Sequence, residues 1–161
     1  MNVSREGASA PDTLIDAVLL ASRALVAVAA RSLSDVADEV TLAQYRTLVV
    51  LASLGPQSLA GLADAVRVTP ATATRMCDRL VRKKLIVRRT ERGDRRQLRV
   101  GLTDTGRDLV KSVSERRRRE IKRILADVPL KDQALLVRAL NRFSAAAGEV
   151  PDQDWSAGWD L

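Results

Sequence analysis

One stretch of the chain carries residues whose types and spacing suit the binding of a nucleic acid. Four of them recur at intervals of three, four and three positions, which places them along one face of a helix: Thr72, Arg75, Arg79 and Arg82. Arginine reads guanine through paired hydrogen bonds to O6 and N7, and threonine contacts a thymine methyl group or a phosphate. Thr69-Pro70 is a typical helix start, and the positive end of a helix also favours a phosphate. A solvated basic face is the alternative interpretation.

The opposite face of the same predicted helix is apolar. It consists of Ala73, Met76, Cys77, Leu80 and Val81. This two-sided pattern is typical of a recognition helix, which packs on a protein core and enters the major groove of DNA. The pattern also places Cys77 in the core, where a thiol keeps a high pKa and reacts slowly. We therefore expect Cys77 to be a packing residue rather than a redox sensor.

A predicted β-hairpin carries a second group of basic residues. Segments 86–90 and 97–102 have the pattern of strands, which makes residues 91–96 the tip. Arginines on such an arm suit the negative potential of a narrow minor groove, although a solvated turn is the alternative. Asp94 would repel phosphate if unpaired, so we expect it to orient a neighbouring arginine. The candidate DNA-binding residues are Thr69, Thr72, Arg75, Arg79, Arg82, Arg92, Asp94, Arg95 and Arg96.

The charge of the chain is concentrated in its middle. Residues 67–125 hold 20 Lys or Arg against 7 Asp or Glu, a net +13, whereas residues 1–66 and 126–161 each carry −3, for a total of +7. A basic middle between two mildly acidic ends is the electrostatic pattern of a polyanion-binding element. A solvated helix face explains some of these arginines, but hardly all of them.

The residue types disfavour several classes of function. The chain has no histidine and one cysteine, which leaves no Cys/His zinc cluster, no internal disulfide and no Ser-His or Cys-His pair. We therefore expect no metal, no cofactor and no enzymatic activity, although carboxylate or lysine chemistry stays open. No signal peptide is predicted. The apolar stretch 14–30 contains Asp16 and Arg23, which favours an amphipathic helix of a cytoplasmic protein over a membrane span.

The order of elements predicts a mainly α-helical fold with a small β-hairpin wing, that is, a winged helix-turn-helix joined to a helical dimerisation region. Helix starts are expected at Asp12, Thr41, Ser58, Thr69, Thr103 and Pro129. The long outer helices have apolar faces with no partner inside the winged module, so we expect them to pack elsewhere. The expected organisation is a disordered N-terminus 1–11, a dimerisation helix 12–40, a DNA-binding domain 41–102, dimerisation helices 103–148 and a tail 149–161.

Three runs of the sequence together resemble the MarR family of regulators: 68–86, 89–96 and 100–107. The resemblance extends over roughly residues 12–147, and it implies a homodimer with interlaced terminal helices and two winged modules that straddle a pseudo-palindrome. It also implies that Asp94 and Arg96 are the Asp-x-Arg motif of the wing, whose arginine enters the minor groove, and that Thr72, Arg75 and Arg79 contact the major groove. Lys84 departs from the family, which usually ends the recognition helix with glycine; the lysine must adopt left-handed geometry or close the helix differently.

Tyr45, Arg46 and Arg116 are candidates for an effector site. By the same resemblance, Tyr45 and Arg46 lie on a helix that borders the ligand crevice of the family. Arg116 begins the run 116–119, which could cradle an anionic effector, touch DNA phosphates, pair with acidic neighbours or simply be solvated.

The sequence as a whole predicts a sequence-specific regulator of transcription that binds double-stranded DNA as a homodimer. In the simplest case it is a repressor that a small anionic or aromatic effector releases from DNA. The alternative is a non-specific architectural nucleic-acid-binding protein, which would need no reading helix and therefore no stripe such as Thr72, Arg75 and Arg79.

Overall fold

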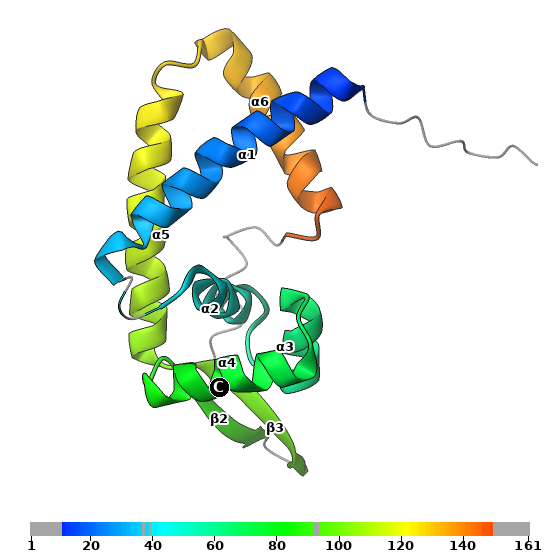
Figure 1. The fold of residues 1–161 in the computed structure, drawn as a ribbon, viewed down its shortest axis with the longest axis vertical. Helices are drawn as coiled ribbons and strands as arrows, with labels where there is room; N and C mark the ends of the chain where they lie inside the picture. Colours follow the sequence, from blue (N-terminus) through cyan, green and yellow to red (C-terminus); the bar gives the residue numbers. More distant parts are fainter. Residues whose placement is uncertain (1–10, 37, 39, 92–93, 150–161) are drawn as a thin grey trace, which may run out of the picture.

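The computed structural model describes residues 11–36, 38, 40–91 and 94–149, with side chains for all of these except 91 and 94–97. The elements are α1 (Asp12–Ser32), a short 3₁₀ helix η1 (Ser34–Val36), α2 (Leu42–Leu54), β1 (Gln57–Ser58), α3 (Leu59–Val66), α4 (Pro70–Arg82), β2 (Ile86–Glu91), β3 (Asp94–Leu102), α5 (Asp104–Leu125) and α6 (Leu130–Ala146). Figure 1 shows α3, α4 and the hairpin at one end of the molecule and α1 and α6 at the other, with α5 running between them. The expected mainly helical fold with a small wing is confirmed.

Four of the helices begin where a hydroxyl side chain can cap them. Thr41, Ser58, Thr69 and Thr103 each accept a hydrogen bond from the backbone N–H three residues further on. At α2 the side chain of Gln44 also reaches back to the N–H of Thr41, which completes a capping box. These starts confirm the helix starts that the sequence predicts at those positions.

Two helices end in left-handed geometry without a glycine. Lys84 has φ +58°, and the N–H groups of Lys84 and Leu85 donate to the carbonyls of Val81 (2.9 Å) and Leu80 (3.0 Å). This pair of bonds is a Schellman closure, which usually relies on glycine at the left-handed position. Arg67, with φ +56°, closes α3 in the same way. Lysine in place of the usual glycine at position 84 therefore adds a steric cost to the helix end but leaves its geometry intact.

The sheet has three antiparallel strands in the order β1-β3-β2. The hairpin is longer than expected, because pairing continues past an irregularity at Thr90/Glu91 to the pair Glu91↔Asp94. The placement of Asp94, Arg95 and Arg96 in a turn was therefore wrong, since all three belong to β3. β1 was missed altogether. It has two residues, which carry no recognisable pattern, and it exists because they pair with Arg99 and Val100.

The core lies at the winged end of the molecule and is built from aliphatic side chains. Its fully buried members include Leu48 on α2, Leu62 on α3, Leu80 on α4, Val100 on β3 and Val113 on α5. One continuous cluster thus joins α2, α3, α4, the sheet and the first half of α5. This packing fixes α4 and the hairpin relative to each other.

The other end of the molecule leaves large apolar side chains exposed. On α1 and α6 they are Leu14, Ile15, Leu19, Leu20, Leu25, Val26, Leu130, Leu135, Val137, Leu140 and Phe143. By length and composition alone, α1 could cross a membrane. A helix that packs against a second protein surface has the same composition, so this property does not separate the two cases. Helix α6 buries no residue at all.

Candidate nucleic-acid interface

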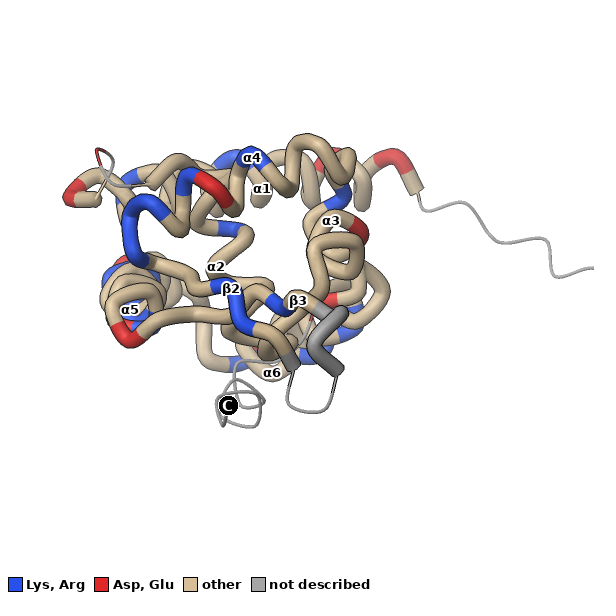
Figure 2. The backbone as a smooth tube through the Cα atoms, turned by 90° about the horizontal axis from the view of Figure 1, so that it is seen from below, with Lys and Arg blue, Asp and Glu red and all other residues tan. Residues whose placement is uncertain are grey.

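Helix α4 presents two distinct faces. Ala73, Met76, Cys77 and Leu80 are buried in the core, and Val81 packs against it partly buried. On the opposite side Thr69, Arg75, Arg79 and Arg82 are exposed and Thr72 is half-buried. Figure 2 looks onto this end of the molecule and shows Lys and Arg positions along α4 and along the hairpin strands. The outward stripe that the sequence predicts therefore lies on a single accessible surface.

A short chain of hydrogen bonds orders the first turns of α4. The hydroxyl oxygens of Thr69 and Thr72 lie 2.9 Å apart, and the Thr72 N–H donates to Thr69 Oγ1 at 3.3 Å. One guanidinium nitrogen of Arg75 lies 3.4 Å from Thr72 Oγ1, to which it donates. Thr72 therefore restrains the arginine one turn further along, in addition to facing outward itself.

A hollow of about 250 Å³ lies between the start of α2 and the outward face of α4. It is lined by Thr41, Ala43, Gln44, Thr72, Arg75, Met76 and Arg79. The contribution of α2 to this surface was missed, because α2 precedes α4 by some 30 residues and only the packing of the core brings them together. A base edge that enters this hollow meets the donors of two arginines.

The hairpin is tied to α4 by an ion pair. Arg88 on β2 donates to Asp78 Oδ1 on α4 at 2.6 Å. Asp78 is the single acidic residue of α4. A lone carboxylate on a basic helix indicates a cationic partner, and this signal in the sequence could have predicted the ion pair. Of the predicted wing residues, Arg92 lies outside the described residues, as do the side chains of Asp94, Arg95 and Arg96.

The base of the hairpin is fixed by a close approach of backbone to backbone. Thr103 Oγ1 donates to the Lys84 carbonyl at 2.6 Å and accepts from the Gly106 N–H at 3.0 Å, while the Thr103 N–H donates to the Leu85 carbonyl at 3.1 Å. A Cβ atom at Gly106 would lie 2.0 Å from that same Leu85 oxygen, so only glycine fits. The start of α5 is thus locked against the end of α4.

Cys77 is fully buried in the inward face of α4, as the sequence predicts. Burial raises the pKa of its thiol above the ordinary value, since a thiolate is poorly solvated there; nearby Arg88 acts in the opposite direction and Asp78 in the same direction as burial. The side chain is therefore a protonated, apolar packing group at neutral pH.

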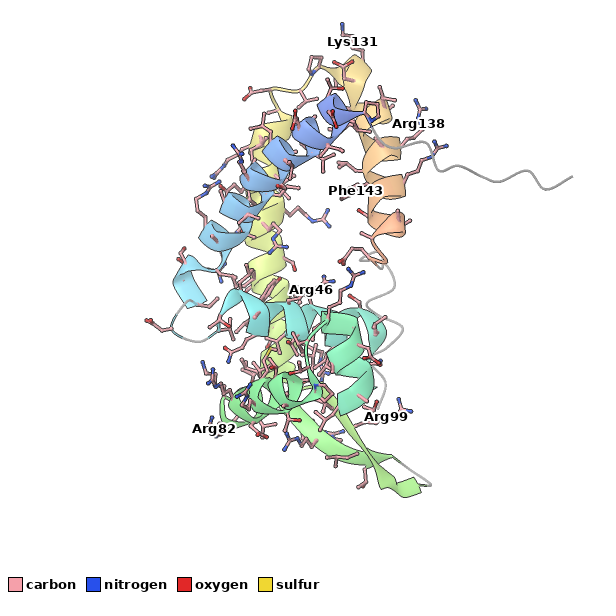
Figure 3. All side chains as sticks on the ribbon, turned by 45° about the vertical axis from the view of Figure 1, so that its right-hand side comes forward. Arg46, Arg82, Arg99, Lys131, Arg138 and Phe143 are labelled. Carbon is pink, nitrogen blue, oxygen red and sulfur yellow. The ribbon has the colours of Figure 1, made fainter. Side chains whose placement is uncertain are left out.

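A cavity of about 660 Å³ lies between α2 and the second half of α5, and none of its lining residues belongs to α4. Its lining is Tyr45, Arg46, Val49, Ser53, Ser114, Arg117, Arg118, Ile121, Lys122, Leu125 and Glu149. Tyr45 is buried, with its hydroxyl 3.2 Å from Ser114 Oγ and the Arg117 guanidinium 5.6 Å from its ring centroid. Figure 3 shows Arg46 on the side of α2 that faces the lower end of α6, remote from Arg82.

The structure brings Tyr45 and Arg46 together at this cavity but not Arg116. Arg116 pairs instead with Asp35 of η1, so its grouping with the other two was wrong. Successive helical residues point in directions about 100° apart, and the next two arginines of the run, Arg117 and Arg118, are the ones that line the cavity. The sequence could not assign these directions before the packing of α5 was known.

Comparison with known proteins identified a family and several related structures. The model of the MarR family matches residues 40–98, and no match was found among curated proteins. The structure of RV1404 from Mycobacterium tuberculosis has 45% identity and a TM-score of 0.80, over 87% of this chain and 95% of that one. Wild-type MarR from Escherichia coli has 20% identity and a TM-score of 0.67, over 84% and 98%. BpsR from Bordetella bronchiseptica, whose DNA binding is regulated by 6-hydroxynicotinic acid, has 24% identity and a TM-score of 0.62, over 82% and 98%.

Proposed function

Since the chain belongs to the MarR family of transcriptional regulators, we propose that it binds a pseudo-palindromic operator in double-stranded DNA as a homodimer. The family consists of regulators of transcription and not of enzymes, which agrees with the lack of histidine. The observation that carries the proposal is the two-faced α4, with its buried apolar stripe and its exposed arginines held on one surface. A helix of this kind enters the major groove with its outward residues against the base edges.

In the proposed complex the first three turns of α4 read the bases. Arg75 and Arg79 donate paired hydrogen bonds to guanine, and each such contact discriminates against a wrong base by about 1–3 kcal/mol. Thr72 contacts a thymine methyl group or a phosphate and holds Arg75 in place. Thr69 lies at the helix start and Arg82 at its end, where they bind the flanking phosphates.

The hairpin supplies the second contact, in the adjacent minor groove. We assign this role to Arg92, Arg95 and Arg96, with Asp94 orienting Arg96. The Asp78–Arg88 pair supports the assignment, because it fixes the arm relative to the reading helix. Arginine is favoured where the minor groove is narrow and its potential most negative.

The homodimer is proposed from the exposed apolar faces of α1 and α6. Contiguous surfaces of this kind are rare on monomeric proteins and mark association sites. A second copy related by a two-fold axis would cover these faces with the same elements and would place two α4 helices on successive major grooves. The charge is arranged accordingly, since α4 and the hairpin, which carry many of the arginines of the basic segment 67–125, lie at the opposite end of the molecule.

The cavity beside α2 is proposed as an effector site that releases a repressor from DNA in the cytoplasm. Four cationic residues line it together with the ring of Tyr45, which suits an aromatic anion. In the described part of the chain, Arg117 Nε is buried without a hydrogen-bond partner, so a turn of this side chain towards a bound anion would break no hydrogen bond of Nε. The regulation of BpsR by an aromatic acid supports the same class of effector here.

The test is footprinting on the DNA upstream of the protein's own gene, with scrambled DNA of the same length as competitor at a fixed salt concentration. A regulator protects two half-sites about one helical turn apart and prefers its site at least 10³-fold over the competitor. Equal protection of both DNAs, with a steep loss of binding as salt rises, would instead identify a non-specific architectural protein.

A further inference from the structure

Glu149 lines the cavity together with Arg46. Its carboxylate accepts two hydrogen bonds from the Arg46 guanidinium, at 2.9 Å and 2.6 Å. This is the paired geometry in which arginine binds a free carboxylate. We propose that Glu149 is a built-in competitor for the effector: a carboxylate ligand binds by displacing Glu149 from Arg46, and this displacement frees the end of α6. The inference rests on the effector role proposed for this cavity.

The end of α6 is shaped to deliver this carboxylate. Gly148 has φ +78°, its N–H donates to the Ala145 carbonyl at 3.1 Å, and the Glu149 N–H donates to the Ser144 carbonyl at 3.0 Å. A Cβ at Gly148 would meet nothing within 4 Å, so glycine is needed there for its backbone angle alone. The closure turns the chain out of the helix axis and aims Glu149 at α2, more than 100 residues earlier in the sequence.

The charges around the pair favour an added anion. Glu149 is the one acidic residue among the described residues that line the cavity, against four cations: Arg46, Arg117, Arg118 and Lys122. The lining therefore keeps a formal charge of +3 (four positive, one negative) when Glu149 is bound. An incoming carboxylate replaces Glu149 at Arg46 and remains close to the other three cations, whereas the released Glu149 is solvated.

The strength of the pair suits exchange. The side chains of Arg46 and Glu149 are 44% and 46% exposed, and an exposed ion pair changes an equilibrium constant by a factor of at most about five. A tether of this strength holds the end of α6 without preventing ligand entry. Helix α6 buries no residue within its own chain and carries a face of the proposed dimer. When Glu149 leaves Arg46, α6 can therefore shift at the dimer interface, and such a shift changes the spacing of the two α4 helices.

The experiment measures the affinity of the full-length protein for benzoate by calorimetry, with the neutral isostere benzamide as a second probe. We expect E149Q to bind benzoate about three- to fivefold more tightly than the unmodified protein does, because the competitor is lost. The variant E115Q has the same change of charge on α5 outside the cavity, so it should change the affinity by less than a factor of about 1.5. On an R46Q background, E149Q should have no further effect.

Hydrogen exchange adds a readout of α6 itself. Benzoate should speed exchange of the amides of residues 145–149 in the unmodified protein, and E149Q should show the fast exchange before any ligand is added. The proposal is overturned if E149Q and the unmodified protein bind benzoate equally, if benzamide competes as well as benzoate, or if benzoate binds to neither. None of these measurements contains DNA, so a failed footprint would reject the proposed function separately.

Discussion

In the proposed complex, Arg75 is the residue on which base reading depends most, since it is exposed on α4 and restrained by Thr72. Arg75→Ala should weaken operator binding by about 1–3 kcal/mol per half-site and relax the base preference at one position of each half-site. Arg138→Ala removes the same charge from α6 and should leave both quantities unchanged. Binding of randomised operators measures them, and an unaltered preference in Arg75→Ala would show that α4 does not read the bases.

Cys77 should affect stability and not DNA binding. Cys77→Ser places a hydroxyl among apolar neighbours, which costs about 1–3 kcal/mol and lowers the melting temperature by roughly 2–4 °C per kcal/mol. Cys77→Ala leaves no polar group to bury and should cost less. Operator affinity well below the melting point should be the same in all three proteins, as the side chain faces away from the exposed stripe.

The raised thiol pKa of Cys77 has a consequence for its reactivity. The native thiolate forms only at a pH above the ordinary thiol pKa, so labelling by iodoacetamide should be slow at pH 7 and should accelerate in alkaline solution or on unfolding. Because the pKa of the thiol is higher in the folded than in the unfolded protein, the protonated thiol contributes its full stabilisation below the unfolded pKa. This stabilisation is lost as the pH rises through the folded pKa. If peroxide abolishes DNA binding and Cys77→Ser prevents that loss, the residue is a sensor.

At the scale of the elements, the two left-handed helix ends offer a direct test of backbone strain. Lys84→Gly should raise the free energy of unfolding by about 0.5–1 kcal/mol, because a non-glycine residue pays a steric cost at φ +58°. The neighbouring residue Lys83, at φ −82°, is the control: it has no left-handed strain to relieve, and Lys83→Gly adds flexibility to the unfolded chain, so this variant should be destabilised. Urea unfolding measures both, and a loss of stability in Lys84→Gly would contradict the strain.

Prediction from sequence succeeded for elements that are specified locally. The caps at Thr41, Ser58, Thr69 and Thr103 depend on residues three positions apart, so the chain itself encodes them. The stripe on α4 depends on helical periodicity in the same way. The features that could not be predicted depend on partners distant in the chain. Strand β1 exists only because it pairs with β3, and the direction of the Arg116 side chain is set by its ion pair with Asp35 of η1. The cavity and its Glu149 belong to this second group.

At the scale of the whole molecule, we expect the exposed apolar faces of α1 and α6 to set the oligomeric state. The protein should sediment as a dimer at micromolar concentration. Leu140→Glu on α6 should raise the dimer dissociation constant by at least about tenfold, because it buries a carboxylate without a partner. Leu54→Glu on α2 starts from a similar exposed fraction, 45% against 48%, and should leave the dimer intact. A monomer in the unmodified protein would contradict the proposed assembly.

The apolar character of α1 also matters while the protein is being made. This helix leaves the ribosome before any surface that could cover it exists, since α5 and α6 are synthesised last and the second copy of the proposed dimer comes from another chain. Its exposed leucines, with Ile15 and Val26, are in the meantime open to aggregation and to chaperones. If the proposed dimer forms, the yield of folded protein should depend on how soon a second chain arrives, so expression level, and not temperature alone, should decide how much of this protein stays in solution.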